Sequence, residues 1–358
     1  MKILFLMQLY PPKHGASTAG EIIKSSEFIN NQFECDYLRI STIPINGSSN
    51  VLKKIFCFFR IHYNIIRLLY NNKYDLVYLA PTAAGFKFYK DFVLCITSKF
   101  FCKNVIYHFH NKGISLNKFV PSFLMKFYFK DVNVILSSPL LKYDIIDYVS
   151  DNHISYCPYG IPDEKSFQYQ KVNQKCIILF FANMIIEKGV FDLLNACLLL
   201  DKKGIDFKCN FVGSWYDVKE TDFINFVKIH NLTKKIFFLG PQYNEEKNKV
   251  LAMADIFAFP TYYSDECFPL GILEALRWNV PVITTYEGAI SEIIEDGITG
   301  FLVPQRNVEI LAKKIELLIQ NPELRKQIGE AGRRKYEKEY TLPKFEKRIA
   351  EILKKVIS

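Results

Sequence analysis

Short apolar runs recur along the whole chain, and stretches with helical spacing separate them. The runs are expected to be buried strands, and they lie at 3–6, 76–80, 105–109, 132–136, 177–181, 207–212, 236–239, 256–259 and 280–284. Residues 245–254 and 270–278 have the spacing of amphipathic helices. Strands that alternate with helices indicate a parallel sheet covered on both faces. The pattern runs through both halves of the chain and predicts an α/β protein.

A break in the pattern divides the chain. With 358 residues, two domains are the default expectation. The stretch 158–176 has prolines, mixed charge and little periodicity, and is typical of a linker. We predict an N-terminal domain at 1–165, a C-terminal domain at 166–342 and a last helix at 343–358. That helix has an apolar face and a lysine face, so we expect it to pack back on the first domain.

Composition excludes several classes of protein. About half of the residues are apolar and nearly a quarter are charged, which is typical of a well-cored globular chain. No stretch reaches the roughly 18 uncharged apolar residues of a membrane span, and the opening MKILFLMQLYPP is interpreted as a first buried strand. The nine cysteines show no CxxC or Cys/His metal spacing. We expect reduced core cysteines in a cytoplasmic protein that is soluble or peripheral on the inner face of the cell membrane.

Positive charge is concentrated in the first half. Residues 1–170 carry 19 Lys and Arg against 12 Asp and Glu, a net +7, whereas the remainder carries 27 against 25, a net +2. The segments 51–73 and 117–130 combine apolar and aromatic faces with lysine and arginine. Such helices either pack in a core with their cations at the edge, or attach to an anionic membrane surface, and both alternatives remain open. Nucleic acid is a poorer explanation, because no recognition motif accompanies the charge.

Candidate chemistry gathers after the apolar run at 256–259. Pro269 is well placed in the first turn of a helix, so the backbone N–H groups of Leu270, Gly271 and Ile272 are expected at its N-terminus, where they favour phosphate. Glu274 lies about one turn further, where it can accept hydrogen bonds from sugar hydroxyls, and Glu266 lies on the preceding loop. The two carboxylates would hold the two ends of a sugar nucleotide.

At these residues the sequence resembles the family-4 type of GT-B glycosyltransferases, which are retaining enzymes that use nucleotide sugars. Their E-x7-E signature corresponds to Glu266 and Glu274, with FPLGILEAL inside it. The resemblance extends in order through FFANMIIEKGVFDLLNA, FVGSW, FFLGPQ, ADIFAFPTYYSDE and EIIEDGITGFLVP. It covers essentially all of the second half. It implies two Rossmann-like domains facing across a cleft.

The resemblance also implies roles for single residues. Lys188 would bind the diphosphate, Glu274 the ribose hydroxyls and Glu266 the transferred sugar. The segment with Gly240 and Gln242 would contact the base through its backbone. The family often has an arginine where this chain has Asn183, so one cation against the phosphates is missing. Each residue has a plainer alternative, since a helix-start lysine or a loop carboxylate is often only solvated.

Two further candidates lie in the first half. The segment YPPKHGASTAGE forms a small-residue loop after the first strand, but the spacing from Gly15 to Gly20 does not make a dinucleotide-binding GxGxxG. In the resembling family this loop contacts the donor diphosphate, which carries over to Gly15. In NVIYHFHN, the resemblance places His110 near the transferred sugar, whereas His108 is expected to pack. No third ligand at suitable spacing supports a metal.

Together these features predict a metal-independent, retaining transfer of a hexose or N-acetylhexosamine, expected from a UDP-sugar. The catalytic residues would be Lys188, Glu266 and His110, with no cofactor. The expected acceptor is a glycan or lipid-linked hydroxyl in bacterial surface polysaccharide synthesis. Two alternatives stay open: a GT-B sugar-nucleotide epimerase, and a non-catalytic glycosyltransferase-like partner subunit.

Overall fold

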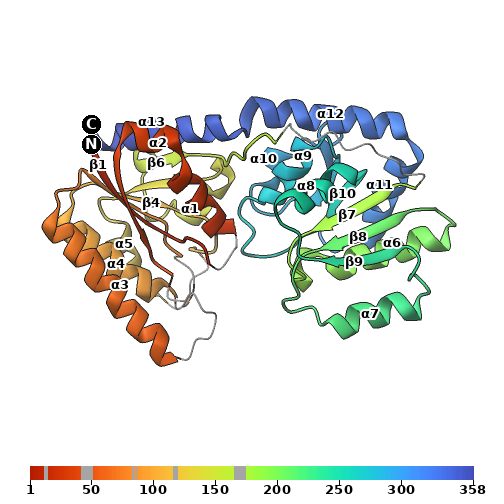
Figure 1. Ribbon diagram of the computed structural model, residues 1–358, viewed down its shortest axis with the longest axis horizontal. Coiled ribbons are helices and arrows are strands. Elements are labelled where there is room, and N and C mark those ends of the chain that lie inside the picture. Colours follow the sequence, from red (N-terminus) through yellow and green to blue (C-terminus); the bar gives the residue numbers. More distant parts are fainter. Residues whose placement is uncertain (12–14, 42–50, 83–84, 86, 116–119, 165–174) are drawn as a thin grey trace. The chain divides into compact units, whose positions relative to one another are not determined.

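The chain forms two compact units, and it crosses between them twice. The computed structural model describes residues 1–11, 15–41, 51–82, 85, 87–115, 120–164 and 175–358. Unit 1 comprises Met1–Tyr159 and Leu342–Ser358, and unit 2 comprises Gly160–Thr341 (Figure 1). The last helix is therefore part of unit 1. Most of the predicted linker, 165–174, lies outside the described residues, and Gly160 to Glu164 belong to unit 2.

Unit 1 is built on a six-stranded parallel sheet in the order β2-β1-β3-β4-β5-β6. Its strands are β1 (Lys2–Met7), β2 (Glu34–Arg39), β3 (Leu76–Leu79), β4 (Val105–His108), β5 (Asn133–Leu136) and β6 (Ile154–Tyr156). Its helices are α1 (Gly15–Ser25), α2 (Glu27–Gln32), α3 (Val51–Asn71), α4 (Lys87–Phe101), α5 (Ser122–Phe129), η1 (Pro139–Asp144), η2 (Asp151–His153) and α13 (Leu342–Ile357). The strand order reverses direction between β1 and β3.

Unit 2 has a second six-stranded parallel sheet, in the order β12-β11-β10-β7-β8-β9. Its strands are β7 (Ile177–Phe181), β8 (Lys208–Val212), β9 (Ile236–Gly240), β10 (Ile256–Phe259), β11 (Val282–Thr285) and β12 (Gly300–Val303). Its helices are η3 (Ile186–Lys188), α6 (Val190–Lys202), α7 (Glu220–Ile229), α8 (Asn244–Met253), α9 (Leu270–Arg277), α10 (Ile290–Ile293), α11 (Val308–Gln320) and α12 (Pro322–Glu339). This is the doubly wound Rossmann order, which reverses between β7 and β10.

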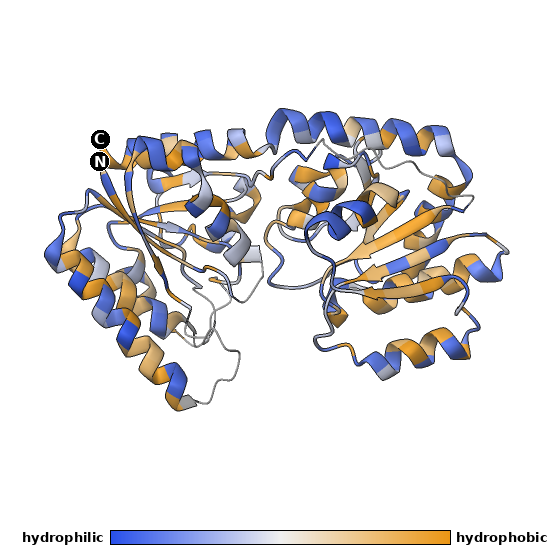
Figure 2. Ribbon diagram, viewed as in Figure 1, coloured by the Kyte–Doolittle hydropathy of each residue, from blue (hydrophilic) through white to orange (hydrophobic). Residues whose placement is uncertain are grey.

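The α/β prediction is confirmed, and all nine expected strands are present within two residues of their predicted ends. The three strands that the apolar pattern missed are β2, β6 and β12, and each lies at the edge of its sheet. An edge strand pairs on one side only and need not be apolar on both faces. In β2, for example, five residues are half-buried and one is exposed. The inner strands are the continuous apolar bands of Figure 2.

One helix prediction needs adjustment. The helix expected at 270–278 begins at Leu270, with Pro269 as its N-cap rather than in its first turn, and ends at Arg277. The last helix, α13, buries Phe345, Ile349 and Leu353 completely, and it packs on α2 and β3 of unit 1. Across the described ranges, no helix is both long and apolar enough to cross a bilayer.

Candidate active site

The topology of unit 2 indicates where a ligand binds. In doubly wound sheets, ligands bind beyond the carboxyl ends of the strands at the point where the strand order reverses. Here that point lies between β7 and β10, which pair through Ile178 and Leu179. The loop after β7 contains Asn183 and leads to Lys188, and the loop after β10 contains Glu266. These are three of the residues singled out in the sequence.

The two loops are joined by backbone contacts. The Tyr262 amide donates to the Glu187 carbonyl at 2.7 Å. Gly189, which follows η3, has a φ of +83°, and a Cβ added there would lie 2.3 Å from the Pro260 carbonyl oxygen. Only glycine permits both this backbone conformation and this close approach. The position of Lys188 is therefore fixed by the loop after β10.

Lys188 and Glu266 form the centre of the candidate site. The Lys188 Nζ lies 3.4 Å from the Glu266 Oε2, and both side chains are largely buried. The rings of Phe259 and Tyr263 flank the Nζ, with centroids 5.7 and 5.6 Å away. The Glu266 Oε2 is buried and makes no hydrogen bond with any residue that the structure describes. A ligand hydroxyl would satisfy this acceptor.

Neighbouring segments hold the Glu266 loop in place. A Cβ added to Gly288, whose φ is +55°, would lie 2.3 Å from the Glu266 carbonyl oxygen. The Ala289 amide donates to the Cys267 carbonyl at 2.9 Å. The hydroxyl of Thr284 on β11 donates to the Phe259 carbonyl at 2.7 Å. These contacts preorganise the loop before any ligand arrives.

The N-terminus of α9 differs in one respect from the prediction. The Ile272 amide already donates to the Pro269 carbonyl at 3.1 Å, because the first turn of the helix closes tightly. The Ile272 amide is therefore not available to a phosphate in this conformation. The sequence leads us to expect that all three amides, Leu270, Gly271 and Ile272, are free for one. Gly271 lies against β7, since a Cβ there would come within 3.4 Å of the Phe181 carbonyl oxygen.

Glu274 has a partner that the sequence analysis missed. The Lys247 Nζ, on α8, donates to the Glu274 Oε1 at 2.5 Å, and both side chains are largely buried. Lys247 lies in the polar run NEEKNK, where nothing distinguishes it from the neighbouring solvated lysine Lys249. Only the packing of α8 beside α9 identifies it.

Asn183, Gly240 and Gln242 lie on other parts of the same sheet edge. The Asn183 Oδ1 accepts from the Ser214 amide at 3.4 Å. Gly240 ends β9 with a φ of +69°, and Gln242 donates from its Nε2 to the Leu239 carbonyl at 2.7 Å. Since β7 and β8 separate β9 from β10, these two residues are two strands removed from the Lys188–Glu266 pair.

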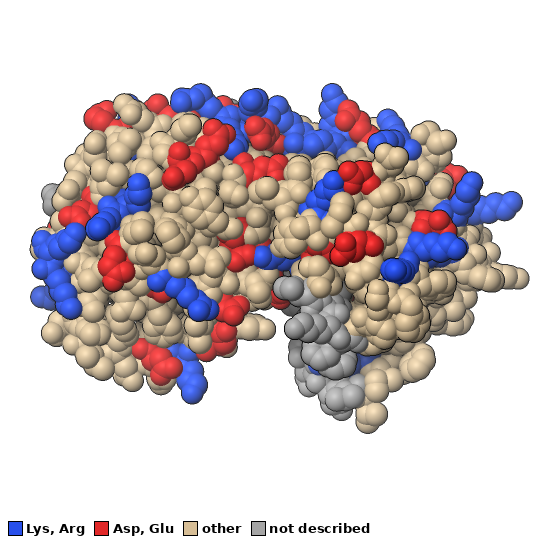
Figure 3. Space-filling view, turned by 180° about the vertical axis from the view of Figure 1, so that it is seen from behind, with Lys and Arg blue, Asp and Glu red and all other residues tan. Residues whose placement is uncertain are grey.

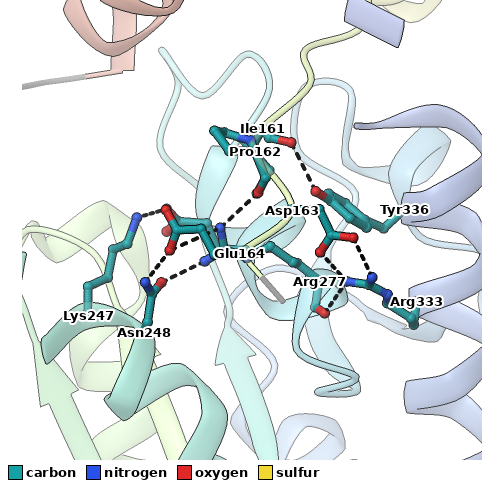
Figure 4. Close-up of polar contacts among 10 residues, drawn as sticks. Ile161, Pro162, Asp163, Glu164, Lys247, Asn248, Arg277, Arg333 and Tyr336 are labelled. Carbon is teal, nitrogen blue, oxygen red and sulfur yellow. Dashed lines mark hydrogen bonds and ion pairs between the residues drawn. The ribbon is translucent and has the colours of Figure 1, made fainter. Parts of the chain in front are cut away.

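A buried arginine fixes the start of unit 2 to α8 and α9, the helices that carry Lys247 and Glu274 (Figure 4). Arg277, on α9, donates to the Pro162 carbonyl at 3.0 Å and to the Asn248 Oδ1 at 2.8 Å. Its Nη1 lies 3.7 Å from the Glu164 Oε2, and Asn248 also donates to Glu164. Sequence reasoning identified none of these residues.

Asp163, the residue just before Glu164, is bound by Arg333 of α12. Arg333 makes a two-pronged ion pair with Asp163, at 2.9 and 2.7 Å, and also donates to the Arg277 carbonyl at 2.7 Å. The Tyr336 hydroxyl donates to the Ile161 carbonyl at 2.9 Å. The segment from Ile161 to Glu164 is therefore held by α8, α9 and α12 together (Figure 4).

In unit 1, the two candidate residues lie on separate segments, Gly15 at the start of α1 and His110 just after β4. Gly15 begins α1 and is exposed, and a Cβ added there would meet no atom within 4 Å. Packing therefore does not require glycine at this position. Residues 12–14 of the same loop lie outside the described residues.

His110 follows β4 and has a local partner. Its Nδ1 is hydrogen-bonded to the hydroxyl of Tyr159, whose ring stacks on those of His110 and His108. His108 is buried and bonded to the hydroxyl of Tyr78, and burial lowers the pKa of His108 well below its usual value. His108 is thus a neutral packing residue, as predicted, and Tyr159 is a neighbour that the sequence did not reveal.

The loop after His110 is also organised by one buried carboxylate. Asp144 accepts hydrogen bonds from the amides of Gly113, Ile114 and Ser115 at 2.8 to 3.0 Å, and from the Ser115 hydroxyl at 2.8 Å. It sits in η1, and its role depends on contacts with residues about thirty positions away. No motif signals it.

Comparisons with known proteins agree with this arrangement. Residues 162–335 match the family model described as glycosyl transferases group 1. The capsular polysaccharide biosynthesis glycosyltransferase CapM of Staphylococcus aureus is 29% identical over 212 residues, which are 56% of this chain and 52% of CapM. The amylovoran biosynthesis glycosyltransferase AmsK of Erwinia amylovora is 26% identical over 52% of this chain and 46% of AmsK. The chain thus spans about half the length of these curated relatives.

Solved structures resemble the whole chain. Sucrose-phosphate synthase of Thermosynechococcus elongatus has a TM-score of 0.80 at 16% identity, covering 99% of both chains. Anabaena HepE in complex with UDP has a TM-score of 0.76 at 17% identity, covering 99% of this chain and all of that one. The fold is therefore GT-B, with two Rossmann-like units, and residues 162–335 of the second unit match the glycosyl transferases group 1 model.

Proposed function

We propose that this protein is a retaining glycosyltransferase that moves a hexose or N-acetylhexosamine from a UDP-sugar to a hydroxyl of a glycan or lipid-linked acceptor in bacterial surface polysaccharide synthesis. The observation that carries the proposal is the buried Lys188–Glu266 pair at the point where the sheet order of unit 2 reverses. It lies inside the region that matches the glycosyl transferases group 1 model. Relatives named for capsule and amylovoran biosynthesis support the polysaccharide context.

In this proposal the diphosphate leaving group is the main electrostatic problem. Lys188 supplies one fixed cation in a largely buried site flanked by two aromatic rings, where burial would strengthen the electrostatic interaction. The amides of Leu270 and Gly271 at the start of α9 add partial positive charge. We propose that these groups suffice without a metal ion.

The two glutamates would hold the sugars at the two ends of the donor. Glu266 has a buried oxygen that a hydroxyl of the transferred sugar would satisfy. Glu274, fixed by Lys247, would accept hydrogen bonds from the ribose. The departing phosphate would take the proton of the acceptor hydroxyl on the same face, so the C1–O bond to the acceptor forms on the side where the bond to the diphosphate breaks. No protein nucleophile is then required, and His110 would position the sugar or the acceptor.

The choice of donor rests on one neighbour. HepE was solved with UDP, and also with UDP-glucose, and both structures share the fold of this chain. The base-contacting role of Gly240 and Gln242 remains a proposal. A panel of donors is therefore the direct way to test the choice of UDP-sugar.

The experiment measures thermal stabilisation and donor turnover with UDP-, GDP- and ADP-sugars, with and without EDTA. The wild type is compared with Glu274→Ala and Lys188→Met, and with Glu246→Ala as a control, since Glu246 is an exposed residue of α8. We expect one UDP-sugar to stabilise and to be turned over by the wild type and the control but not by the two site variants, with or without EDTA.

The alternatives predict different results. An epimerase would convert the donor to an isomeric sugar nucleotide or its hydrolysis product with no acceptor dependence. A non-catalytic partner subunit would be stabilised by a donor without turnover. Activity that EDTA abolishes and Mg²⁺ restores would contradict the metal-independent mechanism.

A further inference from the structure

Helix α3 has two apolar faces, and only one of them is buried against the part of the chain that the structure describes. The inner face buries Ile61, Ile65 and Leu69. On α3, His62 contacts the Thr97 hydroxyl of α4 at 3.3 Å. The outer face carries a second stripe, which is 38 to 79% exposed: Leu52, Phe56, Phe59, Tyr63, Ile66 and Tyr70.

The spacing makes this stripe continuous. Its members alternate in steps of four and three residues, which keeps them on one side of a helix. It extends over about 27 Å at 1.5 Å per residue. Exposed apolar side chains scattered singly are ordinary on a protein surface, but a continuous aromatic stripe marks an interaction site. Figure 2 shows α3 with both apolar and polar residues along its whole length.

Positive charge follows the stripe on one side. Lys53, Arg60 and Arg67 are exposed and seven residues apart, and each directly follows a residue of the stripe. The whole segment 51–73 contains five Lys and Arg and no Asp or Glu. Basic side chains also gather over α12 and α13 (Figure 3), but glutamates are interspersed along those helices. Helix α3 combines exposed cations and exposed aromatic rings with no acidic residue. Helix α5 does so on a smaller scale, with Lys126 beside the exposed Phe123 and Phe127.

We infer that the outer face of α3 binds an anionic phospholipid membrane surface. Aromatic rings are favoured at the boundary between headgroups and acyl chains, and the cation row would lie beside lipid phosphates. A second copy of the chain is a poorer partner for this face. Pairing two α3 helices through their stripes would bring two cation rows together, and neither helix has an acidic residue to balance them.

The experiment measures binding of the full chain to vesicles of phosphatidylcholine alone and of phosphatidylcholine with phosphatidylglycerol. One variant, Phe56→Ser/Phe59→Ser/Tyr63→Ser, removes the centre of the stripe, and a second, Lys53→Gln/Arg60→Gln/Arg67→Gln, removes the cation row. The matched controls change exposed residues of unit 2: Ile224→Ser/Ile229→Ser/Ile298→Ser and Lys228→Gln/Lys313→Gln/Lys326→Gln. All substituted side chains are exposed, so circular dichroism should show native folds.

We expect the wild type and both controls to bind the anionic vesicles, with affinity that falls as salt rises, and to bind neutral vesicles weakly. Removing the three cations should weaken binding by about a hundredfold. The inference is overturned if the wild type does not bind anionic vesicles, or if the controls lose binding equally. It is also overturned if light scattering shows a dimer that the stripe variant dissociates. Vesicle binding requires no transfer activity, so this result is independent of the proposed function.

Discussion

The Lys247 side chain of α8 donates to the Glu274 carboxylate of α9 over 2.5 Å, and this contact joins two helices at the candidate donor site. Neither residue can move without affecting the other, because both are largely buried. Glu274 is proposed to accept hydrogen bonds from ribose, and Lys247 would then hold its carboxylate in the accepting orientation.

Replacing Lys247 with Met should therefore weaken donor binding without removing a group that contacts the transferred sugar. We expect the KM for the donor to rise by about tenfold while kcat changes little, because the interaction is the same in the ground state and the transition state. Lys249→Met, two residues along the same helix and exposed, is the control. A fall in kcat with an unchanged KM would contradict the positioning role.

Asn183 lies where the resembling family often has an arginine, and its side chain is exposed. Replacing it with Arg should add a second cation near the diphosphate and tighten donor binding by several-fold at low salt. The gain should shrink as salt rises. Asn225→Arg, on the exposed surface of α7, should leave the affinity unchanged. Equal affinities for Asn183→Arg and the wild type at low salt would show that this position does not face the phosphates.

Arg277 is buried and binds the Pro162 carbonyl, Asn248 and Glu164. Arg277→Met should destabilise unit 2 by about 2–3 kcal/mol, because the Pro162 carbonyl and the buried Asn248 Oδ1 lose their donor and Glu164 loses its ion pair. Both tryptophans of the chain, Trp215 and Trp278, lie in unit 2, so urea unfolding followed by tryptophan fluorescence measures this effect directly. Arg334→Met, at an exposed position of α12, should cost little. Equal midpoints for both variants would show that the Arg277 contacts add nothing to stability.

The buried, neutral His108 should make the stability of unit 1 depend on pH. Burial, and then the neighbouring His110, hold its pKa well below the usual 6.5, so the folded state keeps it neutral. Below pH 6.5 the unfolded chain binds a proton at His108 that the folded chain does not. The stabilising contribution of the neutral His108 is therefore complete above pH 6.5 and is lost as the pH falls below it. The slope should approach about 1.4 kcal/mol per pH unit.

Urea unfolding followed by far-UV circular dichroism between pH 7.5 and pH 5, a range chosen to span that usual value, would measure this slope. His108→Asn should be less stable at neutral pH, because the bond to Tyr78 changes, but its stability should depend less on pH. His153→Asn, on the exposed η2 turn, is the control and should keep the wild-type slope. An unchanged slope in His108→Asn would refute the assignment.

The central strands could be predicted from the sequence because each is buried on both faces and so is continuously apolar. The edge strands β2 and β6 could not, since most of their residues are only half-buried or exposed and they lack a continuous apolar run. The edge strand β12 is buried throughout, but its four residues begin with a glycine and make only a short apolar run. The same reasoning applies to the site. Lys188, Glu266 and Glu274 were marked by local motifs, whereas Lys247 lies in an ordinary polar helix and is identified only by its contact with Glu274.

What the sequence determined by itself is the alternation of strands and helices, the loops where chemistry gathers and the side chains on them, because periodicity and short motifs are local properties. What only the tertiary structure decided is which side chains meet. Arg277 and Pro162 are 115 residues apart in the chain, and Lys188 meets Glu266 because β7 and β10 are adjacent in the sheet. The sequence could not say which face of α3 would be exposed, because both faces are apolar. Only packing against the rest of unit 1 buries one face and leaves the other exposed.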